Sequence, residues 1–146
     1  MAFRRPDNLI EAKTLTSPNG ERTQIGIAIV KRNDQFLIGI REKNNVLGGL
    51  SEFPGGKCEP EEEPSDCARR ECWEETGLRV RIDEPLTVCR HDYPHGALEL
   101  HFFLCSPAAD EVPVPKGSFV WVDRTELLNL NFPEANAAVV QLLARG

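Results

Sequence analysis

The sequence predicts one layered domain of the α/β or α+β class, in which strands pack between helices. Short apolar runs rich in β-branched residues recur along the chain, and two separate segments carry helical patterns. A length of 146 residues and a mixed composition suit a single domain with one good core.

The elements follow in chain order. Residues 1–22 are polar and contain Pro and Gly, so they predict a partly ordered lead-in before a folded domain at 23–146. Residues 24–31 and 35–40 are apolar runs separated by Asn33 and Asp34, a pattern typical of a β-hairpin. Further strand patterns cover residues 79–90, 98–105 and 118–122, and an apolar helical pattern covers 133–144.

The central helix is predicted over residues 64–76. Pro64 suits a first-turn position, acidic residues precede it, and Gly77 is placed to end the helix. On this helix Glu71, Glu74 and Glu75 are spaced i, i+3 and i+4, so their three carboxylates share one face.

A solvated acidic face is the plain alternative for these carboxylates. It fits poorly, because Glu71 and Glu75 are like charges one turn apart and the favourable pair in the cluster is Arg70 with Glu74. Hard divalent cations bind carboxylate oxygens together with substrate phosphates. We therefore predict that Glu71, Glu74 and Glu75 bind Mg²⁺, with Mn²⁺ as the alternative, while Arg70 orients them and Glu62 reaches in from the preceding loop.

Two adjacent glycines, Gly55 and Gly56, allow close backbone approach to the metal or the phosphates, although a simple turn is the alternative. A metal-activated water that attacks phosphorus, with charge on the diphosphate neutralised, is the chemistry that such a site supports. The predicted reaction cleaves a diphosphate.

One stretch carries a family resemblance. Residues 56–78 read GKCEPEEEPSDCARRECWEETGL, which resembles the Nudix box G-x5-E-x7-R-E-U-x-E-E-x-G-U, where U is aliphatic. All its fixed Gly, Glu and Arg positions are present, and the departure is Cys72 at an aliphatic position, where a buried thiol acts as a small apolar group. The resemblance implies a Nudix α/β/α sandwich with a mixed sheet between helices. It also implies catalytic or metal-binding roles for Gly55, Glu62, Arg70, Glu71, Glu74 and Glu75.

The resemblance extends to the MutT-type branch, which hydrolyses oxidised nucleotides. Residues 50–57, LSEFPGGK, resemble its L/W-E-F-P-G-G-K element, and residues 132–136, FPEAN, resemble its F-P-P-A-N element. The resemblance implies that Asn136 hydrogen-bonds the base, Phe53 lines the base pocket and Arg41 contacts the nucleotide. An Asn offers both a donor and an acceptor, which suits reading a purine edge. The alternatives are ordinary core packing for Phe53, helix capping for Asn136 and a solvated charge for Arg41.

One departure concerns the general base. MutT-type enzymes often carry a Glu in the loop before the Trp-containing strand, but residues 112–118 here hold no carboxylate. Glu71, Glu62 and Glu99 are the candidate bases, and a metal-bound hydroxide that needs little help is the fourth option. The three histidines are predicted to be structural or exposed rather than metal ligands.

Charge and cysteine content restrict the function classes further. A net charge of −6 and a pI near 5.1 argue against a polynucleotide partner and leave a small nucleotide as the predicted substrate. Five cysteines without CxxC or Cys/His ligand spacing favour a reduced compartment. Since no long apolar segment or signal peptide is evident, the sequence predicts a cytoplasmic protein without membrane association. Monomer and homodimer both remain open.

Three functional hypotheses follow. The leading one is a Mg²⁺-dependent pyrophosphohydrolase that converts 8-oxo-dGTP, or a related modified purine nucleoside triphosphate, to monophosphate and pyrophosphate. The second keeps this chemistry on ADP-ribose, a dinucleoside polyphosphate or a pyrimidine triphosphate. The third is a Nudix domain that binds nucleotides as a sensor without hydrolysing them.

Overall fold

The computed structural model describes residues 22–40, 49–94 and 96–146. The elements, in chain order, are β1 (Thr23–Arg32), β2 (Gln35–Ile40), β3 (Ser51–Glu52), β4 (Gly55–Lys57), α3 (Pro64–Thr76), β5 (Val80–Tyr93), β6 (Gly96–Pro107), β7 (Phe119–Asp123), the 3-10 helices η1 (Arg124–Asn129) and η2 (Glu134–Asn136), and α4 (Ala137–Arg145). The boundary predicted at residue 22 remains a prediction, because residues 1–21 lie outside the described part.

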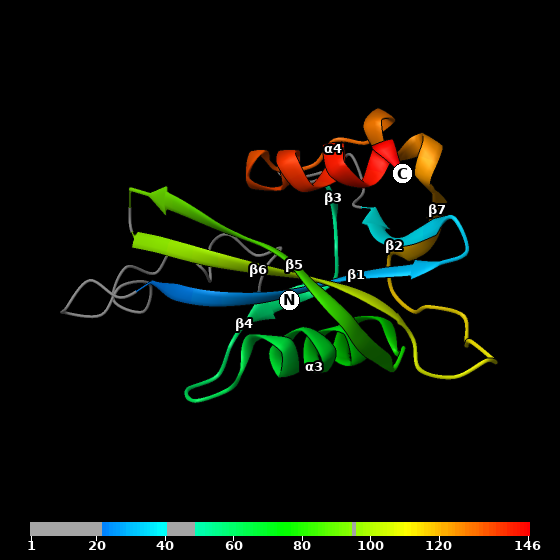
Figure 1. Ribbon diagram of the computed structural model, residues 1–146, viewed down its shortest axis with the longest axis horizontal. Coiled ribbons are helices and arrows are strands. Elements are labelled where there is room, and N and C mark those ends of the chain that lie inside the picture. The colour runs from blue at the N-terminus through cyan, green and yellow to red at the C-terminus, as the bar shows by residue number, and fades with distance from the viewer. Residues whose placement is uncertain (1–21, 41–48, 95) are drawn as a thin grey trace.

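A mixed sheet forms the middle layer. Its strand order is β3-β2-β1-β6-β5, with β4 paired to β1 and β7 paired to β2. The β1–β6 pair is parallel and the other pairs are antiparallel. The helix α3 covers one face, and α4 with the two 3-10 helices covers the other (Figure 1). The predicted α/β/α sandwich is therefore confirmed.

The predicted elements are present, and the β1–β2 hairpin turns at Asn33, which has a positive φ of 57°. Two features differ from the prediction. The short strands β3 and β4 were not predicted, because two or three residues are too few to show an alternating pattern. The last α-helix starts at Ala137 rather than at Pro133, because the chain first forms the tighter 3-10 turn η2.

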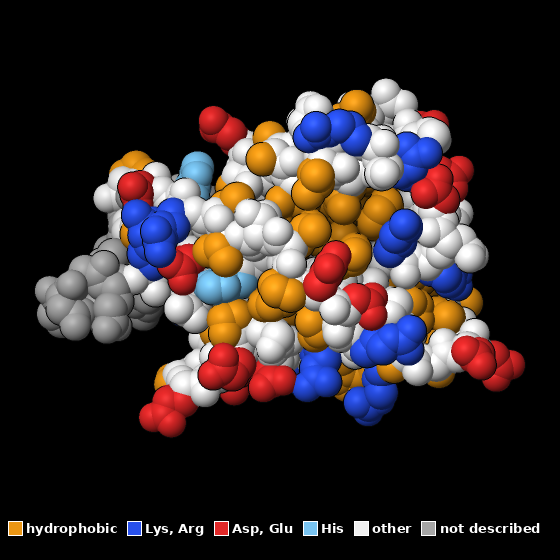
Figure 2. Space-filling model, in the orientation of Figure 1, with side chains coloured by type: hydrophobic (Ala, Val, Ile, Leu, Met, Phe, Trp, Pro, Cys, Tyr) orange, Lys and Arg blue, Asp and Glu red, His pale blue; other side chains and the backbone are white. Residues whose placement is uncertain are grey.

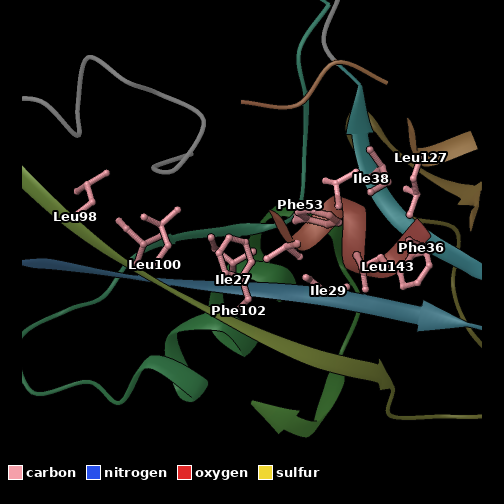
Figure 3. Packing of buried hydrophobic residues seen from close by; sticks show 13 residues of the cluster. Ile27, Ile29, Phe36, Ile38, Phe53, Leu98, Leu100, Phe102, Leu127 and Leu143 are labelled. Atoms are coloured by element: carbon pink, nitrogen blue, oxygen red, sulfur yellow. The ribbon is translucent and has the colours of Figure 1, made fainter. Parts of the chain in front are cut away.

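Hydrophobic clusters lie on both faces of the sheet. Along β1 successive side chains alternate, so Ile27 and Ile29 join the cluster beneath α4 while Ala28 and Val30 join the cluster beneath α3. Figure 3 shows the first cluster, in which Phe53 lies among apolar side chains of the sheet and α4. A central strand buried on both faces fixes the surfaces on which the two helices pack.

Candidate active site

The helix α3 spans the predicted residues and ends at the predicted glycine. Pro64 occupies its first turn, and Gly77 adopts the left-handed conformation with φ of 79°. Glu71 lies on the buried face of the helix, whereas the Glu74 side chain is 54% exposed. The three carboxylates that share one helical face therefore differ strongly in their solvent environment.

Two glycines let α3 lie directly on the sheet. A Cβ on Gly26 of β1 would come within 2.5 Å of the Pro64 carbonyl oxygen, and a Cβ on Gly56 of β4 would come within 2.4 Å of Glu71 Cδ. Beside them, the Gly55 backbone N–H donates to Glu75 Oε1 at 3.3 Å. Both glycines of the Gly55-Gly56 pair lie in β4, so the simple-turn alternative is wrong. Their backbone lies against the Glu71 and Glu75 carboxylates, and its approach to a metal or to phosphates stays a prediction.

We expect Gly56→Ala to displace the Glu71 carboxylate, because the added methyl group would overlap its carboxyl atoms. The free energy of unfolding should fall by about 1–3 kcal/mol, the usual range for an overpacked site. Turnover should fall with it. A double-mutant cycle with Glu71→Ala, followed by urea unfolding, tests the reason: the penalty of Gly56→Ala should largely vanish when the carboxylate is absent. An equal penalty in both backgrounds would contradict it.

Arg70 connects the acidic residues. Its Nε donates to Glu62 Oε2 at 2.8 Å and its Nη2 donates to Glu62 Oε1 at 2.9 Å, a bidentate pair. Its Nη1 lies 3.2 Å from Glu71 Oε2 and 3.3 Å from Glu74 Oε1. The structure thus brings together the four residues named as catalytic from the sequence, with Glu62 entering from the loop before α3.

The electrostatics of the cluster are unbalanced at Glu71. Burial, followed by the neighbouring Glu75 carboxylate, raises the pKa of Glu71 to about 7. Arg70 lowers this pKa, but by less than burial and Glu75 raise it, so the negative charge of Glu71 is only partly compensated. An oxygen-rich donor set with uncompensated negative charge fits a hard divalent cation.

Among the residues that the structure describes, no three His, Cys, Asp or Glu side chains are placed as they stand to hold an ion, so the acidic side chains must reorient to bind one. Glu74 contacts Arg70 only at an exposed position, where an ion pair contributes little, so its side chain can reorient at low cost.

The three candidate bases differ in their partners. Hydrogen bonding to Arg70 lowers the pKa of Glu62. Arg90 Nε donates to Glu99 Oε2 at 3.0 Å and, as the first cause, lowers the pKa of Glu99, whose other oxygen lies 2.9 Å from His101 Nε2. Glu71 is the one of these three carboxylates whose pKa rises toward neutral pH, which suits proton acceptance.

The residues expected to read the base lie on the α4 side of the sheet. Phe53 is 1% exposed and stacks on Phe132, with ring centroids 5.0 Å apart. Asn136 is fully buried, and neither atom of its amide has a hydrogen-bond partner in the described part of the chain. It precedes α4 without a side-chain capping bond, so the capping alternative is wrong. Arg41 lies outside the described residues.

Sequence reasoning missed two residues beside this site. Phe132 stacks on Phe53, and Glu52 is a carboxylate only 4% exposed at the end of β3. Both stand in the two motifs noted above, yet a motif does not show that segments so far apart in sequence come together. The parallel bridge between Leu50 and Asn131 brings these segments side by side.

Comparisons with known proteins agree with this geometry. A family model described as NUDIX domain matches residues 26–142. An 8-oxo-dGTP diphosphatase from Proteus vulgaris is 38% identical over 93 residues, 64% of this chain and 82% of that protein. A CTP pyrophosphohydrolase from Escherichia coli is 30% identical over 78 residues, 53% of this chain and 58% of that protein. The crystal structure of the MutT protein from Bacillus halodurans has a TM-score of 0.69 at 23% identity, covering 85% of this chain and 83% of that chain.

The chain therefore belongs to the Nudix family, and the predicted MutT-type hydrolase class is confirmed. Hydrolases of this family generally use divalent metal ions. Within the described ranges, no helix is long and apolar enough to cross a membrane.

Proposed function

We propose that this protein is a Mg²⁺-dependent nucleoside triphosphate pyrophosphohydrolase that acts on 8-oxo-dGTP or a related modified purine nucleotide. Its products are a nucleoside monophosphate and pyrophosphate, and Mn²⁺ is the alternative metal. The observation that carries the proposal is the packing of the Glu71 carboxylate on the Gly56 backbone, beside Glu75 and within 3.2 Å of Arg70. The cytoplasm is the proposed location, and the protein works as a monomer or a homodimer.

Each residue of the cluster has a proposed role. Glu71, Glu74 and Glu75, with the Gly55 backbone, hold the metal, which when bound supplies charge neutralisation on the phosphates and activation of water. Arg70 holds Glu71 in place, and Glu62 fixes the guanidinium of Arg70 through its bidentate pair. These contacts restrict the carboxylate rotamers before substrate binds, which supports preorganisation of the site.

The proposed protein base is Glu71 rather than Glu62 or Glu99. Both alternatives are fixed by arginine and have a lowered pKa, which weakens them as proton acceptors at neutral pH. Glu71 is not held in a bidentate arginine pair, and in the metal-free protein its pKa is raised, which favours it over the two arginine-bound carboxylates as the acceptor of a proton from the attacking water.

Base recognition is assigned to Asn136, with Phe53 lining the pocket and Arg41 contacting the nucleotide. A buried amide without partners is unfavourable by about 1–3 kcal/mol, and a purine edge can supply a donor and an acceptor. Phe53 stacks on the less buried Phe132, and this aromatic pair supports an apolar wall for the base.

We expect Asn136→Ala to lower the preference for 8-oxo-dGTP over dGTP, measured as the ratio of kcat/KM values, by roughly 10- to 100-fold. Stability should hold, because the native amide makes no internal hydrogen bond among the described residues. Asn129→Ala is the control, since the Asn129 amide donates to Glu126 Oε1 at an exposed position. An unchanged preference in a folded Asn136→Ala protein would remove base reading from this residue.

The second candidate function keeps the chemistry and changes the substrate. The CTP pyrophosphohydrolase relative supports a pyrimidine triphosphate, and ADP-ribose or a dinucleoside polyphosphate use the same diphosphate cleavage. A non-catalytic nucleotide sensor is the third candidate, and the complete set of Glu62, Glu71, Glu74 and Glu75 argues against it.

A substrate panel tests the proposal. Purified protein with Mg²⁺ is assayed for pyrophosphate release from the four dNTPs, 8-oxo-dGTP and CTP, and for AMP formation from ADP-ribose. Selective turnover of 8-oxo-dGTP would support the proposal. Preference for CTP or ADP-ribose would select the second candidate, and nucleotide binding without any turnover would select the sensor.

A further inference from the structure

Two cysteines face each other where β4 packs against α3. The Cys58 N–H donates to the Gln24 carbonyl at 2.9 Å, so the β1–β4 ladder continues past Lys57. Side chains alternate along a strand, so residues two positions apart point to the same face. The Cys58 side chain therefore lies on the face to which a side chain at Gly56 would point. That face is the α3 face, since a Cβ on Gly56 would touch Glu71.

Strand and helix spacing then places Cys67 against Cys58. Two strand residues span roughly 6.6 Å and one helical turn spans roughly 5.4 Å. A step of two residues along the strand therefore matches a step of one turn along the helix. Glu71 meets Gly56, and Cys67 lies one turn earlier on the helix, where its Sγ donates to the Gly56 carbonyl at 3.2 Å. The neighbouring Cys58 thiol and burial raise the pKa of Cys67, which agrees with this placement. The two thiols therefore face each other between the strand and the helix.

The two thiols differ in access. Cys67 is fully buried, whereas Cys58 is half-buried and lines an open groove of about 980 Å³ together with Glu59, Glu62 and Glu99. Acidic side chains gather near the loop between β4 and α3, at the lower left of Figure 2. A small neutral oxidant can enter this groove, while an anionic thiol compound is repelled from it.

We propose that Cys58 and Cys67 form a reversible disulfide when the protein meets hydrogen peroxide. In the first step the Cys58 sulfur attacks the peroxide O–O bond, which gives a sulfenic acid and one water. In the second step the Cys67 sulfur displaces that hydroxyl, its proton leaves with the hydroxyl as a second water, and the S–S bond forms. Two thiols are oxidised and one peroxide is reduced, so Cys67 protects Cys58 from irreversible oxidation. This inference is independent of the proposed function.

The experiment treats the full-length protein with hydrogen peroxide in the presence of a chelator, removes the peroxide, and then blocks the remaining thiols with N-ethylmaleimide in concentrated urea, so that the buried cysteines also react. Wild type should bind the reagent at three of its five cysteines and lose the mass of two hydrogens. Dithiothreitol should restore labelling at all five. The oxidised protein should unfold at a higher urea concentration than the reduced one, because the disulfide restricts the unfolded chain.

The choice of protease determines whether the disulfide between Cys58 and Cys67 can be identified by mass spectrometry. The segment 58–69 has no Lys or Arg before its last residue, so trypsin leaves both cysteines in one peptide. A protease specific for Glu cuts between them after Glu61 or Glu62, since Glu59 and Glu63 each precede a proline, and the two fragments should then stay joined only until reduction.

Single variants complete the test. Cys58→Ser should abolish the disulfide, and Cys67→Ser should instead accumulate sulfinic or sulfonic acid at Cys58. Cys89→Ser, also at a half-buried cysteine, is the matched control and should oxidise as wild type does. Five labelled thiols after peroxide treatment of wild type, or a linkage that includes Cys89, would overturn the proposal. The Cys58→Ser result stands alone if Cys67→Ser does not fold.

Discussion

Glu74→Gln should lower kcat roughly 100- to 1,000-fold, the usual effect of removing one group that stabilises transition-state charge. The fold should be unaffected, because the Glu74 side chain is 54% exposed and its pair with Arg70 is a surface contact. A steady-state assay on the best nucleotide of the panel, with circular dichroism and thermal melting beside it, measures both expectations.

Asp66→Asn is a matched control for this variant. Asp66 lies on the same helix, its side chain is also 54% exposed, and it pairs with Arg69 at 2.8 Å. It should retain the wild-type rate, since it lies away from the carboxylate cluster. A folded Glu74→Gln protein that turns over within a few-fold of wild type would remove Glu74 from the predicted metal ligands.

The sequence predicted the elements that carry a regular pattern. The helix with Pro64 at its start and Gly77 at its end agrees with the structure, because local capping chemistry defines both ends. The β1–β2 hairpin was predicted for a similar local reason, since Asn33 tolerates the left-handed turn. Strands β3 and β4 depend on pairing with β2 and β1 rather than on their own residues, so no local pattern indicated them.

The sequence predicted which residues form the candidate site better than it predicted their burial and their long-range contacts. Helical spacing placed Glu71, Glu74 and Glu75 on one face, but it did not show that Glu71 is buried while Glu74 is exposed. That difference arises from tertiary packing, in which Gly56 lets the strand come into contact with the Glu71 carboxyl group. The stacking of Phe53 on Phe132 is likewise a long-range contact that spacing alone does not predict.

The burial of Glu71 implies a large pH effect on the stability of the metal-free protein. Its pKa is about 7 in the folded state and near 4.5 when unfolded. Below pH 4.5 the carboxyl is protonated in both states and has no effect. Between pH 4.5 and 7 the folded state binds more protons than the unfolded state, so stability from this group falls as pH rises. Above pH 7 the loss is complete, and the shift corresponds to about 3 kcal/mol.

Glu71→Gln should therefore stabilise the metal-free protein at pH 8 while it abolishes turnover. The expected gain in the free energy of unfolding is about 1–3 kcal/mol, since the neutral amide avoids the charge cost but gives up part of the contact with Arg70. Urea unfolding in a chelator at pH 5 and pH 8 measures it, and the difference from wild type should be small at pH 5 and large at pH 8.

Comparing the variant with wild type at each pH cancels the opposite contributions of Glu62 and Glu99, whose lowered pKa values favour folding at higher pH. In the presence of Mg²⁺ the wild type should be more stable than Glu71→Gln, because a bound cation compensates the Glu71 carboxylate in wild type and has less charge to compensate in the variant. If Glu71→Gln were less stable than wild type at pH 8 without metal, the carboxylate would not be strained by its neighbours. The electrostatic argument for a cation at this position would then fail, because it depends on negative charge that the protein itself leaves uncompensated.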